Sequence, residues 1–430
     1  MNRSLLLKTL IVGALALVLM IPVGMIQGLV AERQARRNDA VAGIAEGWGK
    51  RQTVSAPMIV IPYERHWTEV RQETVDGKQR ETRVEKVEAK TLRIPPQNLQ
   101  WGGVADVSEK ARGIYKARLY GIFLEAKGEF QLPSRASAED GKSRYRWFTP
   151  RLELGVSDPR GIRVATGATV DGRQYVFAPG AGDTSGVHSQ ITEHSFSEPK
   201  RLSFSLGLEL AGSEAFSLAP PAADTSVSLR ANWPHPSFQG RFLPATHDIR
   251  PDGFTAQWRI SRLATQGAAS EQIVVSFIEP AGVYQQLERA SKYGFLFLGL
   301  TFAAFMLFEI TRRLAIHPIQ YALVGLALAM FFLLLTALSE HIDFALAYAI
   351  ATAACVGLIT TYLIYVLQSF LLGTAFGVSL ASLYAVLFAL LKAEDYALLG
   401  GSVVLFLLLA AVMLATRRLD WYRLSRANAY

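Results

Sequence analysis

Glu340, His341 and Asp343 fall within four positions of one another. Two carboxylates beside an imidazole could relay protons, or could serve as the acid and base of a membrane hydrolase. The same residues lie in a short polar stretch between two apolar segments, where charges are commonly solvated or cap the next helix. We expect this second role, and no catalytic residue among the three.

His188, His194 and Glu309 are the other candidates for chemistry. The two histidines could hold a metal ion, but no cysteine is near and a zinc site needs further ligands. We therefore expect structural or solvated histidines. Glu309 stands at the end of an apolar segment, where an ionisable side chain is a candidate transport residue. Arg312 and Arg313 follow at helical spacing, which favours an interfacial ion pair.

The segment "WPHPSFQGRFLP" (Trp233 to Pro244) is too aromatic and too rich in proline for an ordinary loop. Two interpretations are open. It forms a rigid corner whose aromatic side chains complete a core, or an exposed surface that recognises an envelope lipid, glycan or protein. The candidate binding surface consists of Trp233, His235, Phe238, Arg241 and Phe242.

Charge divides the chain into a polar part and an apolar part. Residues 293–416 hold only eight Asp, Glu, Lys or Arg side chains. This contrast predicts an α-helical polytopic membrane protein with six transmembrane helices and a large all-β, sandwich-like periplasmic domain between helices one and two. We expect a transmembrane anchor at 1–31, the β-rich domain with helical stalks at 32–292, a five-helix bundle at 293–416 and a cytoplasmic tail at 417–430. The net charge of +8 does not require a nucleic-acid partner.

Six apolar segments account for the predicted spans. The first, Leu10 to Ala31, has 22 uncharged residues, a length that favours a retained anchor over a cleaved signal peptide. The others are expected at Tyr293–Phe308, Pro318–Leu338, Ile342–Leu367, Ser369–Leu391 and Tyr396–Thr416. The shortest of these should extend backward through "YQQLERASKYG" as one continuous helix.

Arginines indicate the orientation of the spans in the membrane. They cluster after the second span and in the tail, at Arg312, Arg313, Arg417, Arg418, Arg423 and Arg426. The loops "SEHID" and "KAED" together hold one Lys or Arg residue, Lys392. Short cytoplasmic loops are enriched in basic residues, so both termini are predicted in the cytoplasm and the large domain in the periplasm. The arginines directly after the first span oppose this orientation, but large domains translocate despite such charge.

Residues 54–280 are dominated by period-two alternation, which indicates half-buried antiparallel strands. "LSFSLGLEL" at 202–210, "VSLRANW" at 227–233 and "FTAQWRI" at 254–260 each place large apolar side chains on one face. Asp76-Gly77 predicts an exposed hairpin. Residues 32–50 are expected to form a helical stalk, and the glycine-rich segment 178–189 a loop.

Basic residues flank the β domain where it joins the membrane, and acidic residues occupy the two short outer loops. The candidate docking residues are Arg33, Arg36, Arg37, Arg289 and Lys292 on the basic side, with Glu340, Asp343, Glu394 and Asp395 on the acidic side. We expect the basic segments to lie across the acidic loops and fix the orientation of the domain. Binding to anionic lipid headgroups is the alternative.

Motifs for catalysis or cofactors are not found in the sequence. Walker A, HExxH and Ser/Thr nucleophile motifs are absent, and the single cysteine, Cys355, allows no intrachain disulfide. We expect no cofactor and no metal, and a non-enzymatic protein; a transporter or membrane enzyme acting through the five-helix bundle is the alternative. Gly373 and Gly377 form a GxxxG motif that serves either packing within the bundle or a homo-oligomer contact.

Longer motifs run from the first span to the last: "IPVGMIQGLVAERQ", "WPHPSFQGRFLP", "GFTAQWRISRLA", "YGFLFLGLTFAAFMLFE", "IHPIQYALVGLAL", "LSEHIDFALAY" and "EDYALLGGS". Together they make the chain resemble, nearly end to end, the CreD family of cell envelope integrity proteins. The resemblance implies a place in the inner membrane and a link to envelope stress, colicin tolerance and a two-component regulon. It implies no assigned biochemical activity. The expected partners are the lipid bilayer and an envelope lipid, glycan or protein ligand.

Overall fold

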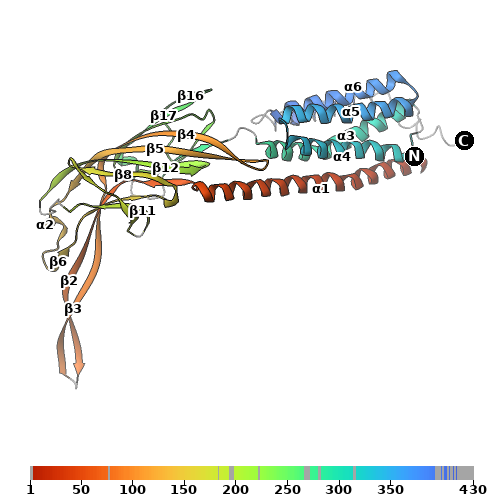
Figure 1. Ribbon diagram of the computed structural model, residues 1–430. Coiled ribbons are helices and arrows are strands. Elements are labelled where there is room, and N and C mark those ends of the chain that lie inside the picture. The colour runs from red at the N-terminus through yellow and green to blue at the C-terminus, as the bar shows by residue number, and fades with distance from the viewer. Residues whose placement is uncertain are drawn as a thin grey trace. The chain divides into compact units, whose positions relative to one another are not determined.

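The computed structural model describes residues 3–75, 78–182, 184–192, 198–220, 223–265, 272–278, 282–312 and 316–392, with helical positions at 399, 401–403, 406, 410 and 413 (Figure 1). The chain divides into two compact units. One comprises Met1–Asn38 and Ala281–Tyr430, and is called the helical unit below. The other comprises Asp39–Pro280, and is called the β unit.

Long apolar helices make up the helical unit. They are α1 (Arg3–Trp48), whose last turns belong to the β unit, α3 (Val283–Arg312), α4 (Pro318–Ser339), α5 (Phe344–Leu367) and α6 (Phe370–Lys392). The stalk predicted at 32–50 is helical as far as Trp48. Because α3 begins at Val283, the predicted backward extension of the second apolar segment is confirmed.

Four of the described helical segments are long and apolar enough to cross a membrane: Leu10–Trp48, Pro318–Ser339, Phe344–Leu367 and Phe370–Lys392. Three of them match predicted spans to within two residues at each end. The segment Tyr293–Phe308 lies within α3, which is not among the four. The sixth predicted span, Tyr396–Thr416, and the tail at 417–430 lie largely or wholly outside the described residues.

Small residues let α6 approach α5 closely. A Cβ atom added at Gly373 would collide with Ile364, and one added at Gly377 would collide with Thr360, both on α5. The GxxxG motif therefore packs within the bundle, which is one of the two roles predicted for it.

The described strands of the β unit form three sheets. An eight-stranded sheet has the order β16-β17-β14-β4-β5-β12-β8-β9, a six-stranded sheet has β10-β11-β7-β2-β3 with β6 paired to β2, and a four-stranded sheet has β1-β13-β18-β15. The strands are β1 Gln52–Ser55, β2 Met58–Val75, β3 Lys78–Ile94, β4 Pro96–Arg112, β5 Tyr115–Leu132, β6 Arg144–Trp147, β7 Arg151–Gly155, β8 Ile162–Val170, β9 Arg173–Tyr175, β10 Ala178–Ala181, β11 Thr184–Gln190, β12 Lys200–Ser213, β13 Ala215–Ala219, β14 Asp224–Ala231, β15 Pro236–Gly240, β16 Thr246–Arg250, β17 Gly253–Ile260 and β18 Ile273–Phe277. A short helix, α2 (Arg135–Ala138), and two 3-10 turns, Pro159–Gly161 and Arg262–Thr265, complete it.

Alternation along the strands sorts side chains between a core and an outer face, as the sequence predicts. Residues 202, 204, 206, 208 and 210 of β12 and 254, 256, 258 and 260 of β17 are all buried. They belong to one core to which strands of all three sheets contribute. The predicted sandwich-like domain therefore contains three sheets around its core. The expected antiparallel pairing is confirmed for β12, β14 and β17, but β14 also runs parallel to β4, and β1 runs parallel to β13.

Two local predictions had different outcomes. The hairpin at Asp76-Gly77 is confirmed by the antiparallel pairing of β2 and β3 up to Val75 opposite Lys78, although the two turn residues lie outside the described residues. The expected loop at 178–189 was wrong, since β10 and β11 pair there. Its glycines permit the pairing: Gly186, at φ +149°, presses against the backbone of β7, where no Cβ would fit.

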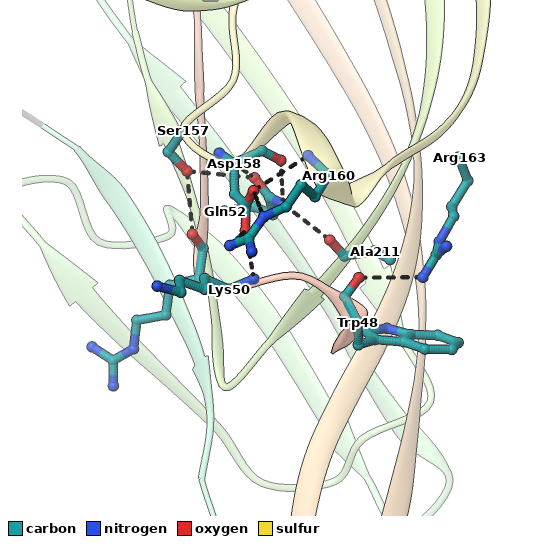
Figure 2. A network of polar contacts seen from close by, with 9 residues as sticks. Trp48, Lys50, Gln52, Ser157, Asp158, Arg160, Arg163 and Ala211 are labelled. Atoms are coloured by element: carbon teal, nitrogen blue, oxygen red, sulfur yellow. Dashed lines mark hydrogen bonds and ion pairs between the residues drawn. The ribbon is translucent and has the colours of Figure 1, made fainter. Parts of the chain in front are cut away.

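A buried polar network around Gln52 secures the entry of the chain into the β unit (Figure 2). The Gln52 side chain is fully buried, and its Nε2 donates to the carbonyl oxygens of Asp158 at 3.0 Å and Ala211 at 3.1 Å. Its Oε1 accepts from the N–H of Asp158 at 3.3 Å. The Arg160 guanidinium donates to the Asp158 carboxylate at 2.9 Å, and this bond holds the pKa of Asp158 below its ordinary value.

The last turns of α1 pack on one end of β5. Val41 contacts Ala117 and Leu119 of that strand. The Trp48 indole donates to the carbonyl of Tyr120 at 3.3 Å, and the Arg163 guanidinium lies 4.8 Å from the centre of the Trp48 ring. These contacts cover that end of the outer face of the eight-stranded sheet.

Candidate functional site

The aromatic segment at 233–244 forms a corner that ends in an edge strand. β15 (Pro236–Gly240) pairs only along β18 among the described strands, and it begins with a proline, which suits an edge position because proline donates no ladder hydrogen bond. The sequence predicted the corner but not the strand. Trp233 lies beyond the end of β14, which stops at Ala231.

Two indole groups fasten this corner to the core. Trp233 donates to the carbonyl of Ile278 at 3.0 Å, and the fully buried Trp258 donates to the carbonyl of Phe242 at 3.1 Å. The ring of Phe238 meets that of Trp258 edge to face at 5.7 Å.

Of the five predicted surface residues, Trp233, Phe238 and Phe242 thus pack against the core, while His235 and Arg241 are exposed. These contacts favour the structural interpretation of the corner.

The candidate docking residues divide into those the structure brings together and those it does not. Within the helical unit, Nε of Arg33 on α1 lies 3.5 Å from Oε1 of Glu340, and the hydroxyl of Tyr284 on α3 donates to the same oxygen at 3.3 Å. Glu340 caps the end of α4, so one carboxylate links three helices. Tyr284 was not identified from the sequence, where a tyrosine near a helix start carries no particular signal.

Several of the other docking candidates make contacts within a single helix or loop, and two lie outside the described residues. Arg36 pairs with Glu32 on α1, and Lys292 pairs with Glu288 on α3 at 2.8 Å. Asp343 caps α5 by accepting from the N–H of Ala345 at 2.9 Å, as predicted for this loop. Arg37 lies on α1 and Arg289 on α3, while Glu394 and Asp395 lie outside the described residues.

Reversing the charge of Glu340 should loosen the end of the helical unit where α1, α3 and α4 meet. We expect Glu340→Lys to lower the midpoint of thermal unfolding of the full chain in detergent, because Arg33 would then face a like charge and Tyr284 would lose its acceptor. The double variant Arg33→Glu/Glu340→Lys should recover much of the loss. Equal midpoints for the single and double variants would show that the ion pair contributes nothing.

The remaining candidates for chemistry are held by ordinary contacts. Nδ1 of His188 lies 2.8 Å from the carbonyl oxygen of Gly180, and His194 is not among the described residues. The buried carboxylate of Glu309 accepts from the hydroxyl of Tyr321 at 2.8 Å. The predicted pairing with Arg312 and Arg313 falls on side chains that lie outside the described part of the chain. No cluster of metal-ligating side chains occurs within the described ranges.

The outer face of the eight-stranded sheet is hollowed, a feature missed by the sequence analysis. Two shallow hollows of ≈ 540 and ≈ 390 Å³ follow one another along strands β4, β14 and β17. The first is lined by residues 104–106, 230–232 and 253–255, with Asp248, Arg250 and Asp252. The second is lined by residues 100–102, 226–228 and 257–259, with Glu125 and Lys127. We call this surface the sheet groove.

Register explains which side chains line the groove. Ser226 stands between Gln100 and Arg259, and Ser228 stands between Gly102 and Gln257, on neighbouring strands. All of these residues are exposed, whereas the residues that alternate with them are buried in the core. The polar half of each alternating pattern, which sequence analysis treats as merely solvated, therefore comes together on one surface.

Several apolar helices joined to a β-rich unit define a class of membrane-anchored protein with a large extramembrane domain. A family model for the inner membrane protein CreD matches residues 4–422, and the chain belongs to this family. It is 34% identical over 424 residues to the inner membrane protein CreD of Escherichia coli K12, covering 95% of this chain and 92% of that protein. The resemblance stated from the sequence is confirmed.

Solved structures add little. An M1 zinc metallopeptidase from Deinococcus radiodurans matches with a TM-score of 0.21 and 9% identity, over 46% of this chain and 53% of that one. Yeast LTA4 hydrolase in complex with bestatin matches with a TM-score of 0.20 and 10% identity, over 44% of this chain and 30% of that one. Scores this low carry no argument about the chain.

Proposed function

We propose that this chain is a six-span protein of the inner membrane that displays its β unit in the periplasm, with both termini in the cytoplasm. The arginine distribution supports this orientation: Arg312 and Arg313 follow the second apolar segment and four more arginines lie in the tail. The loop between α4 and α5 carries Glu340 and Asp343 and no Lys or Arg.

The proposed activity of the β unit is binding of an envelope component, without catalysis. The observation that carries it is the sheet groove, an extended hollow surface lined by exposed polar side chains. Surfaces of this kind suit recognition, because their hydrogen-bonding groups are preorganised by the strands beneath them.

Transport or catalysis through the helices is the alternative function. It would be favoured by an ionisable side chain that lies deep in a span without a partner. Glu309 lies near the end of α3 and is hydrogen-bonded to Tyr321, so it supports this alternative only weakly.

Labelling of introduced cysteines tests the orientation. In a Cys355→Ser background, Ser228→Cys should react with a membrane-impermeant thiol reagent in cells whose outer membrane alone is permeabilised, because Ser228 is exposed on the β unit. A cysteine placed after Tyr430 should react only once the inner membrane is broken. The reverse pattern would place the β unit in the cytoplasm and contradict the proposal.

A further inference from the structure

Four neutral hydroxyl and amide side chains lie together in the second hollow of the sheet groove. Gln100, Ser226, Ser228 and Gln257 lie in two adjacent rows across β4, β14 and β17. Their side chains make no hydrogen bond within the described part of the chain, and all four are exposed. Hydroxyl and amide groups both donate and accept, so they match a ligand whose own groups do the same.

An exposed aromatic ring lies on β5, the strand next to β4, and several glycines are near it in the sheet. Phe123 on β5 is 44% exposed and lies opposite Val104, which is 59% exposed. Its ring leans over Gly207 of β12, where an added Cβ would lie 3.7 Å from Cζ. An added Cβ at Gly102 or Gly121 would meet nothing within 4 Å, so the space above these two glycines is open. An exposed aromatic face of this kind can stack on the apolar face of a ring-shaped ligand.

The position of the groove restricts what can bind. β4 and β14 are central strands, paired on both sides, so their backbone groups are already used by the sheet. A peptide adding itself as a further strand would need an unpaired edge. A ligand on this face must be recognised by side chains alone, over the two hollows that run along the same strands.

Two arginines lie on the groove without a partner among the described side chains. Arg259 is exposed opposite Ser226, and Arg230 is exposed opposite Thr255, so they lie on the two sides of the row that contains Ser228. Guanidinium groups favour carboxylates, which they can bind through two hydrogen bonds. Carboxylates also line the hollows, at Asp106, Glu125, Asp248 and Asp252. The surface therefore matches a polyhydroxylated ligand that carries few acidic groups, placed to meet the two arginines.

We propose that the sheet groove binds the glycan chain of the cell wall. Gln100, Ser226, Ser228 and Gln257 would bond its hydroxyl and amide groups, and Phe123 would stack on a sugar ring. Arg230 and Arg259 would meet the carboxylates of the peptides attached to the glycan. The inference rests on the proposed function, because this glycan is available only to a domain outside the inner membrane.

Filling the second hollow tests the inference. The full chain in detergent should sediment with purified peptidoglycan sacculi and should bind a soluble hexamer of β-1,4-linked N-acetylglucosamine. Gly102→Trp should weaken binding of the sacculi and of the hexamer by about tenfold or more. The indole ring would fill the open space above position 102 without straining the sheet. Phe123→Ala should also weaken both. Exchanging both arginines for glutamine should weaken binding of sacculi while leaving the neutral hexamer within about twofold.

The matched control is Ser203→Trp, because Ser203 is exposed on β12 but lines neither hollow. It should bind sacculi as the unaltered chain does, and a circular dichroism spectrum unchanged in every variant shows that the sheet is intact. No binding by the unaltered chain would overturn the inference, as would equal binding by Gly102→Trp and Ser203→Trp. A wrong orientation of the β unit would be detected separately from a failure of this inference. It would appear in the cysteine labelling and would leave sacculus binding in vitro unaffected.

Discussion

Replacing Trp258 by alanine is expected to destabilise the β unit by about 3–5 kcal/mol, the range found when large buried aromatic side chains are removed. The Trp258 side chain is only 1% exposed, and it packs against Phe238 of the corner. Its indole also donates to the carbonyl of Phe242, so the substitution removes both a packing contact and a hydrogen bond that fixes the corner.

Tryptophan fluorescence during urea unfolding of the full chain in detergent measures this effect. Six of the seven tryptophans lie between residues 48 and 258, so the signal reports mainly on the β unit. Trp233→Ala should cost less, about 1–3 kcal/mol, because Trp233 is half-buried. Leu243→Ala, at a side chain 65% exposed, should change stability by no more than about 0.5 kcal/mol. If Trp258→Ala were as stable as Leu243→Ala, the contacts of Trp258 with the corner would not stabilise the β unit.

Periodicity was enough to predict the elements that depend on local sequence. Apolar runs predicted α4, α5 and α6 closely, and alternation predicted β12 and β17 with their buried faces. These signals are strong because one side of each element must face a core or a membrane. Edge strand β15 was missed because prolines stop one strand and admit another only at an edge, which a single sequence cannot reveal.

Long-range register was not predictable, and the candidate site depends on it. Ser228 lies opposite Gly102 only because β14 pairs in parallel with β4, which is more than a hundred residues away in the chain. Nothing in the local pattern specifies that pairing. Similarly, Arg33 and Glu340 were each identified as docking residues, but their contact with Tyr284 required the helices to be placed.

Gln52 shows how an inconspicuous residue can be critical. In the sequence it is one polar residue in "RQTVSAP", at the start of a short strand, where exposure would be the ordinary expectation. In the structure its side chain is fully buried and bonds to two segments that lie over a hundred residues downstream, at Asp158 and Ala211. Its backbone N–H also donates to the hydroxyl of Tyr120, whose pKa burial raises above its ordinary value, so that hydroxyl keeps its proton.

Gln52→Leu is therefore expected to cost about 3 kcal/mol or more, although leucine is apolar and similar in size. The substitution leaves the carbonyl oxygens of Asp158 and Ala211, and the N–H of Asp158, without the partner they have now. Each buried polar group left unsatisfied costs about 1–3 kcal/mol, and burial of extra apolar surface offsets only part of this. The same urea titration measures the loss.

Gln100→Leu is the matched control, because Gln100 is an exposed glutamine with no side-chain hydrogen bond in the described part of the chain. This substitution should change the free energy of unfolding by about 0.5 kcal/mol or less. If Gln52→Leu were as stable as Gln100→Leu, the network in Figure 2 would not secure the entry of the chain into the β unit.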